Sequence, residues 1–274
     1  MNERNVKMIA LDCDGTLFYR HSTISAEGKS LLKQLKENGT IIVLNTGRPL
    51  YSIRHNVPES LYDYAVSENG ALIYNTNTKI RTESSPLTKE DTDYLIKYLE
   101  TERVMIVLSS KGSSQYVYSQ KHHITRKLIP TLKNIAHRSF KNRIHLDTKI
   151  DESRLQNIHK ICYSGLPHTL KKIQKETKEK GYEAVLVSPV WLEVMPFGIS
   201  KGKALESIMA IENIDRADVI AIGDGENDIA MIEAAGIGVA MKNAMASVRK
   251  HADFTAPSVN EDGAVKWLKE YLSI

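Results

Sequence analysis

Five short, largely apolar runs recur along the chain, and glycine, asparagine, aspartate or threonine bounds each of them. They occupy residues 8–11, 40–44, 65–66, 218–222 and 237–240. An uninterrupted apolar run is typical of a strand covered on both faces, because such a strand has no side that faces water. The runs therefore predict the strands of a parallel sheet buried between helices.

The intervals between these runs carry the spacing of amphipathic helices. In residues 25–38 three leucines share one face, and Gly39 stands where a helix would stop. Residues 200–211 and 227–235 show similar patterns. Strands and helices that alternate at this rhythm predict a Rossmann-like α/β core with a doubly wound parallel sheet.

The pattern changes between about residues 81 and 190. An amphipathic helix is followed by the segments RVMIVLSS and SSQYVYS, and the Lys-Gly turn between them indicates adjacent antiparallel strands. A second helix, residues 169–180, lies between two further apolar segments. We therefore expect an inserted α+β domain, residues 83–190, and an α/β core formed by residues 1–82 and 191–274.

Composition narrows the class of protein. Apolar residues make up 42% and charged residues 26% of the 274 residues, as in ordinary globular proteins. The net charge of +4 comes from dispersed lysines, so no nucleic acid partner is expected. No run approaches the roughly 18 apolar residues of a membrane helix. The only two cysteines, Cys13 and Cys162, cannot build a disulfide framework, which favours a cytoplasmic location.

Polar and acidic residues follow the predicted strands at the point where each strand ends. These strand-end segments are 12–14, 45–48, 67–70 and 223–228. Because the carboxyl ends of parallel strands meet at one edge of a sheet, where α/β proteins bind ligands, the four segments should converge there. Each segment alone would be an ordinary loop or helix cap. Their common position predicts a functional site.

The predicted site holds more negative charge than it could keep without a cation. It contains Asp12, Asp14, Asp224 and Asp228. Two like charges 4 Å apart repel by about 4 kcal/mol at an effective dielectric constant near 20. A ligand set made only of oxygen atoms favours Mg²⁺ over zinc. Lys201, at the start of a predicted helix, would add a second positive charge.

The remaining strand-end residues favour a phosphoryl ligand. Thr46 offers a hydroxyl group, and Gly15 and Gly47 allow the backbone to approach an anion closely. Two aspartates one residue apart can then divide the chemistry. One would attack phosphorus, and the other would protonate the leaving alcohol and afterwards activate water.

Four motifs in this order resemble one known family. DCDGT, the threonine of NTGR, the lysine of SKG and the segment GDGEND are similar to the motifs of the haloacid dehalogenase superfamily of aspartate-nucleophile phosphatases. SENGALIY and WLEVMPFGISKGKAL resemble its Cof-type branch, in which a class IIB cap domain is inserted. The resemblance covers the core segments, before about residue 81 and after about residue 190.

The resemblance implies a role for each matching residue. Asp12 would be the nucleophile, Asp14 the general acid and base, and Thr46 and Lys201 the pair that binds the phosphoryl group. The implied Mg²⁺ site comprises Asp12, Asp14 through its backbone carbonyl, Asp224 and Asp228. The implied substrate-binding residues are Gly47, Arg48 and Asn227.

The implied activity is Mg²⁺-dependent hydrolysis of a small phosphorylated metabolite, such as a sugar phosphate or a phosphorylated cofactor, through an aspartyl-phosphate. Two alternatives stay open: a phosphomutase with the same machinery, and a non-enzymatic receiver-type phosphoacceptor domain. A receiver domain would place its phosphoacceptor after a later strand and gives no reason for a long insertion. The sequence allows either a monomer or a homodimer.

Overall fold

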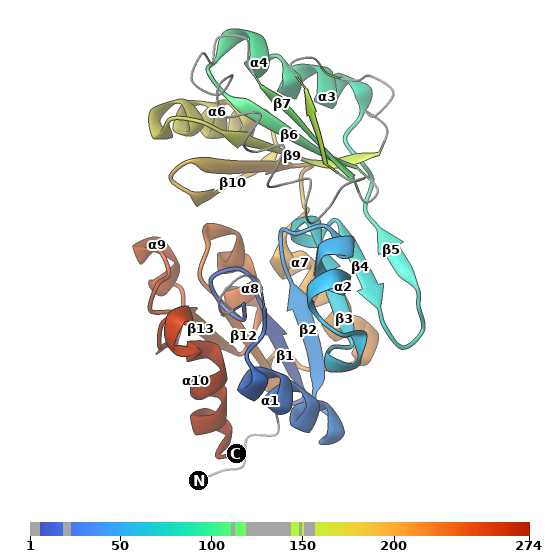
Figure 1. Ribbon diagram of the computed structural model, residues 1–274, viewed down its shortest axis with the longest axis vertical. Helices are drawn as coiled ribbons and strands as arrows, with labels where there is room; N and C mark the ends of the chain where they lie inside the picture. The colour runs from blue at the N-terminus through green and yellow to red at the C-terminus, as the bar shows by residue number, and fades with distance from the viewer. Residues whose placement is uncertain (1–5, 19–22, 111–112, 119–143, 148–149, 151–156) are drawn as a thin grey trace. The chain divides into compact units, whose positions relative to one another are not determined.

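The computed structural model describes residues 6–18, 23–110, 113–118, 144–147, 150 and 157–274. The chain forms two compact units, each with its own sheet (Figure 1). The first unit comprises Met1–Glu83 with Ile199–Ile274, and the second comprises Ser84–Gly198. Of the predicted inserted domain, residues 111–112, which include the predicted Lys-Gly turn, and residues 119–143, 148–149 and 151–156 lie outside the described residues.

The described strands of the first unit form one sheet in the order β14-β13-β12-β1-β2-β3-β4-β5. Neighbouring strands from β14 to β3 run parallel, whereas β4 pairs antiparallel with β3, and β5 pairs antiparallel with β4. The bounds are β1 Met8–Leu11, β2 Ile41–Asn45, β3 Tyr64–Ser67, β4 Leu72–Asn75, β5 Arg81–Glu83, β12 Val219–Gly223, β13 Ile237–Met241 and β14 Phe254–Ala256.

Helices cover both faces of this sheet, as the apolar runs predict. Alternate residues of β1 point to opposite faces: Ile9 packs in the core that includes α1 and α10, and Met8 packs in the core that includes α7 and α8. Every residue of β1 is therefore buried. The helices are α1 Ala26–Glu37, α2 Leu50–Asn56, α7 Lys201–Glu212, α8 Ile229–Ala234, α9 Ala246–Arg249 and α10 Gly263–Leu272, and the short 3₁₀ turns are η2 Glu59–Leu61, η3 Glu68–Gly70, η5 Arg216–Asp218, η6 Glu226–Asp228 and η7 Val259–Glu261.

The second unit is an α+β domain. Its described strands form a sheet in the order β10-β11-β9-β6-β7-β8, which is antiparallel except between β7 and β8. Helix residues Leu95 and Leu170 pack with strand residues Ile106 and Tyr163 in one core. The elements are α3 Lys89–Ile96, α4 Tyr98–Thr101, β6 Met105–Ser110, β7 Ser113–Tyr118, β8 Ile144–Asp147, β9 Ile158–Ser164, α6 Pro167–Glu179, β10 Glu183–Ser188 and β11 Trp191–Met195. The predicted fold class, an α/β core with an inserted α+β domain, is confirmed.

The second boundary of the insertion differs from the sequence prediction. We placed residues 191–274 in the core, but β11 pairs antiparallel with β9 and β10, and the second unit ends at Gly198. Leu192 and Val194 of this strand pack in the core of the second unit. This strand lies only a few residues before the lysine motif in the sequence. The sequence prediction therefore assigned both to the core, although the boundary between the units falls between them, after Gly198. The first boundary lies between Glu83 and Ser84.

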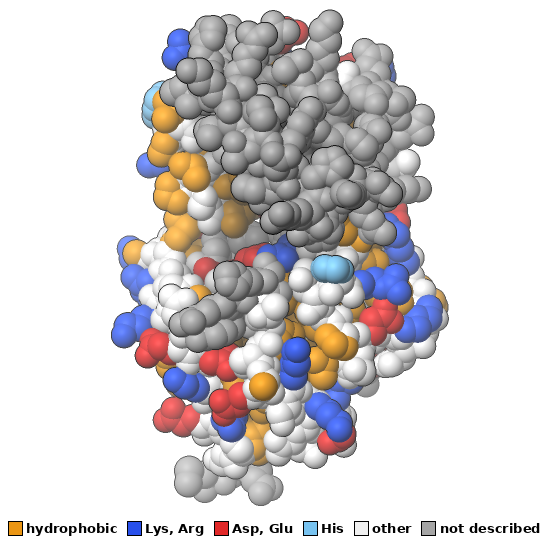
Figure 2. Space-filling view, viewed as in Figure 1, with side chains coloured by type: hydrophobic (Ala, Val, Ile, Leu, Met, Phe, Trp, Pro, Cys, Tyr) orange, Lys and Arg blue, Asp and Glu red, His pale blue; other side chains and the backbone are white. Residues whose placement is uncertain are grey.

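Charged residues are dispersed, as the composition suggests. Figure 2 shows basic and acidic side chains interspersed over the visible face of the first unit. Among the described residues, no helix is long and apolar enough to cross a bilayer.

Candidate active site

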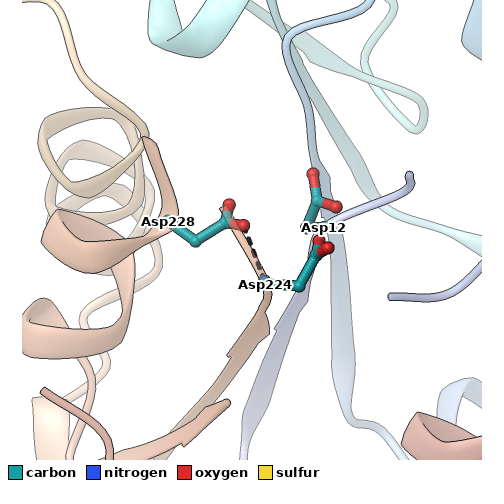
Figure 3. A group of neighbouring side chains, drawn as sticks. All are labelled: Asp12, Asp224 and Asp228. Atoms are coloured by element: carbon teal, nitrogen blue, oxygen red, sulfur yellow. Dashed lines mark hydrogen bonds between the residues drawn. The ribbon is translucent and has the colours of Figure 1, made fainter. Parts of the chain in front are cut away.

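Residues from three neighbouring strand ends meet at the carboxyl edge of the first unit's parallel strands. Asp12 directly follows β1, Thr46 directly follows β2, and Asp224 directly follows β12. β1 and β12 are paired neighbours, and the backbone N–H of Asp12 donates to the carbonyl of Ile222 at 3.0 Å. Figure 3 shows Asp12 and Asp224 extending from these adjacent strand ends, with Asp228 facing them from η6.

Lys201, the first residue of α7, lies buried between two of the carboxylates. Its Nζ is 2.5 Å from Asp12 Oδ1 and 2.6 Å from Asp228 Oδ1. Burial disfavours a charged lysine, but attraction to Asp12 and Asp228 outweighs it and raises the pKa of Lys201 above its ordinary value. Lys201 is therefore cationic. Its own backbone carbonyl accepts a hydrogen bond from the Asn45 side chain at 3.0 Å.

Asp228 shapes the loop that carries Asp224. Asp228 Oδ2 accepts hydrogen bonds from the backbone N–H groups of Asp224 and Gly225, both at 2.9 Å. Its Oδ1 is thus free to face Lys201. Ligand atoms of Asp12, Asp224 and Asp228 all lie within 4.8 Å of one another. The carboxylates of Asp12, Asp224 and Asp228 therefore converge, whereas the prediction assigned Asp14 to the metal site through its backbone carbonyl.

Burial and the repulsion between neighbouring carboxylates raise the pKa values of two carboxyl groups of the cluster. Burial raises the pKa of Asp12 well above its ordinary value against the attraction of Lys201, and repulsion from Asp228 and Asp224 adds to the rise. Burial, followed by repulsion from Asp228, raises the pKa of Asp224 to about 7. A cation near these groups would lower both values. The oxygen-only donor set fits a hard divalent cation, so the cluster is a candidate metal site.

The Asp14 carboxylate lies outside this cluster because Arg48 holds it. Arg48 donates from Nε and Nη2 to the two carboxylate oxygens of Asp14, each at 2.5 Å. The guanidinium also donates to Ser52 Oγ at 3.3 Å and lies 4.9 Å from the centre of the Phe18 ring. The Asp14 side chain remains 56% exposed. Between the two aspartates, Cys13 points into the apolar core.

The other predicted site residues lie around the same edge. Thr46 is buried, and its Oγ1 accepts a hydrogen bond from the Arg48 N–H at 3.2 Å, with Gly47 in the turn between them. Asn227 donates to Asn69 Oδ1 at 3.1 Å, so its contact here is with a side chain from the end of the third strand.

Sequence reasoning missed Asn243, which follows β13. Its Nδ2 donates to the Gly15 carbonyl at 2.9 Å and to Asp224 Oδ2 at 3.2 Å. A polar residue after a predicted parallel strand was the signal that identified the other site residues. Asn243 lies three residues beyond the predicted run 237–240, after Met241 and Lys242, so this signal is weaker at the end of that run.

The fold and these side chains together identify the class of enzyme. An α/β core carries an inserted α+β domain, and aspartates and a lysine cluster at the carboxyl edge of its parallel strands. The chain belongs to the haloacid dehalogenase-like hydrolase family, whose model matches residues 9–268. Within it, the protein is a phosphatase of the Cof-type branch with a subclass IIB cap. The match spans both units, which disfavours the receiver-type alternative.

Known proteins are similar over nearly the whole chain. The chain is 32% identical to YxeH of Bacillus subtilis (strain 168), covering 96% of this chain and 97% of YxeH. It is 28% identical to the 5-amino-6-(5-phospho-D-ribitylamino)uracil phosphatase YcsE of the same organism, covering 98% and 96%. A haloacid dehalogenase-like hydrolase from Bacteroides thetaiotaomicron matches with a TM-score of 0.76 at 28% identity, covering 97% and 99%. The subclass IIB sugar phosphatase BT4131 has the same fold, with a TM-score of 0.81 at 21% identity, covering 98% and 100%.

Proposed function

We propose that the protein is a Mg²⁺-dependent phosphatase that hydrolyses small phosphomonoesters through an aspartyl-phosphate on Asp12. One observation carries the proposal: Asp12 directly follows β1, and its carboxylate contacts the cationic Lys201 and clusters with the carboxylates of Asp224 and Asp228. This arrangement supports the proposal, because positive charge at this position would hold a phosphoryl group against an oxygen of Asp12.

Two aspartates carry the bond changes in this proposal. An oxygen of Asp12 forms a bond to phosphorus as the ester P–O bond breaks, and Asp14 gives its proton to the departing alcohol oxygen. Asp14 then accepts a proton from water as the water oxygen bonds to phosphorus and the bond to Asp12 breaks. The products are the alcohol, inorganic phosphate and the original enzyme.

The Mg²⁺ site would use carboxylate oxygens of Asp12 and Asp224 and the backbone carbonyl of Asp14, with Asp228 orienting the loop around it. When bound, Mg²⁺ supplies positive charge that balances the phosphoryl oxygens and the nucleophile. Lys201 and the Thr46 hydroxyl would bind phosphoryl oxygens, because Lys201 contacts Asp12 from the start of α7 and Thr46 follows β2, the strand next to β1. The proposed substrate-binding residues are Gly47, Arg48 and Asn227.

The substrate would be a small phosphorylated metabolite. YcsE is a phosphatase for a ribitylamino-uracil phosphate, and BT4131 is a sugar phosphatase. These names support a sugar phosphate or a related phosphorylated metabolite as the substrate, and the family resemblance keeps a phosphorylated cofactor in the proposed class. We propose no nucleic acid or membrane partner, and we leave monomer and homodimer as equal alternatives.

A substrate panel with a matched variant tests the proposed function. Wild type and Asp12→Asn would be assayed with Mg²⁺ on hexose phosphates, 5-amino-6-(5-phospho-D-ribitylamino)uracil, FMN and pyridoxal phosphate. Wild type should release inorganic phosphate over many turnovers, whereas Asp12→Asn should lose almost all activity with an unchanged circular dichroism spectrum. Transfer of phosphate to a second sugar instead of water would identify a phosphomutase. Near wild-type hydrolysis by folded Asp12→Asn would refute the nucleophile.

A further inference from the structure

Asn243 connects three segments that are far apart in sequence. It lies in the exposed turn between β13 and α9. Its amide group donates to the Gly15 carbonyl, after β1, and to the Asp224 carboxylate, after β12. Its Oδ1 accepts a hydrogen bond from the backbone N–H of Val259 at 2.9 Å. One side chain therefore holds the turn after the nucleophile, a proposed metal ligand and the loop before α10 together.

The Gly15 turn presses directly on Asp224. Gly15 has a φ of +78°, and a Cβ at this position would lie 2.2 Å from Asp224 Oδ2. This close approach leaves Asp224 little freedom on that side. Thr16 Oγ1 donates to the other carboxylate oxygen, Asp224 Oδ1, at 3.2 Å. The two oxygens of Asp224 are thus held by two different donors, one of which is Asn243.

We propose that Asn243 is a positioning residue of the metal site: by fixing the Asp224 carboxylate against the Gly15 turn, it sets both the affinity and the selectivity for Mg²⁺. The proposal rests on the Mg²⁺ site of the proposed function and adds a residue to it. Each Asp224 oxygen has about two acceptor positions. The hydrogen bonds from Thr16 and Asn243 therefore leave room for a cation.

Selectivity follows from the different geometric demands of the two common hard cations. Mg²⁺ requires nearly ideal octahedral ligands at short distances, whereas Ca²⁺ accepts longer and less regular arrangements. A loosened Asp224 should therefore weaken Mg²⁺ binding more than Ca²⁺ binding. A residue that only stabilised the fold would not change this ratio in the folded protein. The ratio therefore separates positioning from general stabilisation.

Calorimetric titration of metal-free protein with MgCl₂ and with CaCl₂ tests the proposal. The proteins would be wild type, Asn243→Ala, Asn243→Ser and the control Asn260→Ala, which changes an exposed asparagine in the neighbouring turn η7. We expect the Mg²⁺ dissociation constant of both Asn243 variants to rise about 10- to 100-fold, as for loss of other groups that orient metal ligands. The Ca²⁺ constant should rise less, and Asn260→Ala should match wild type.

Folding and metal binding are separated within the same experiment. Loss of the bond to Val259 can lower the melting temperature of the metal-free variants, so the titration is run well below it. The Asn243→Ser variant is included because serine is favoured in turns and keeps this exposed position polar. Equal Mg²⁺ affinity in wild type and the Asn243 variants, or equal losses for both cations, would overturn the role of Asn243 while leaving the proposed function intact. A wild type that binds neither cation would overturn the metal site itself.

Discussion

Replacement of Lys201 by methionine is expected to destabilise the metal-free first unit strongly, because it leaves two buried carboxylates without their cation. At an effective dielectric constant of about 20, the Lys201–Asp12 contact at 2.5 Å corresponds to roughly 7 kcal/mol of attraction, which the burial of the charges offsets in part. Removing one partner of a buried ion pair costs about 3–5 kcal/mol in the free energy of unfolding. A typical domain has only about 5–15 kcal/mol in total.

Urea unfolding in EDTA measures this loss. The titration would use a Trp191→Phe background, which leaves Trp267 in α10 as a fluorescent probe of the first unit. Lys203→Met is the matched control on the same helix, because Lys203 is 66% exposed and pairs with Glu206 at the surface. The control should lose at most about 1 kcal/mol.

The comparison between the two lysines decides the outcome. Added Mg²⁺ should recover part of the stability of Lys201→Met, since a cation would again face Asp12. If Lys201→Met loses no more stability than Lys203→Met, Lys201 does not compensate the buried carboxylates, and the electrostatic account of the site fails.

Three further predictions concern proton transfer, metal and pH. Asp14→Asn should lower kcat/KM by about 10²- to 10⁴-fold on alkyl phosphates but much less on p-nitrophenyl phosphate, whose leaving group needs no proton; equal losses would exclude an acid role for Asp14. EDTA should abolish hydrolysis and Mg²⁺ should restore it, so full activity after rigorous metal removal would contradict the metal site. The raised pKa of Asp224 means that the metal-free native protein binds more protons than the unfolded chain between pH 3.8 and about 7, so its stability should fall as pH rises through this window. The gain in melting temperature from Mg²⁺ should increase over the same range, because protons compete for the ligand oxygens; a pH-independent gain would contradict this.

The core sheet was largely predictable because its signal is local. Strands β1, β2, β3, β12 and β13 all contain the predicted apolar runs, because burial on both faces favours apolar residues along each strand. The polar residues Asn45 and Ser67 are the last residues of β2 and β3. The edge strands have no such signal. β5 consists of Arg81, Thr82 and Glu83, all exposed, and its position follows from pairing with β4.

The site was predictable to the extent that its residues follow strands. Asp12, Thr46 and Asp224 each follow one of three neighbouring parallel strands, so the backbone brings these residues to one edge regardless of the direction of their side chains. The direction of a side chain is a tertiary property, so the sequence could not show that Asp14 turns to Arg48 and away from the carboxylate cluster. Likewise, nothing local to Asn243 shows that its amide reaches Gly15 and Asp224.

The most direct test of covalent catalysis uses Asp14→Asn with p-nitrophenyl phosphate. This substrate releases its leaving group without an acid, whereas hydrolysis of the aspartyl-phosphate lacks its base, so the phosphoenzyme should accumulate. Rapid mixing should give a burst of p-nitrophenolate equimolar with enzyme, and mass spectrometry of the acid-quenched protein should locate the phosphoryl group on Asp12. Hydrolysis without a covalent phosphoryl group, or a phosphoryl group on another residue, would contradict the account.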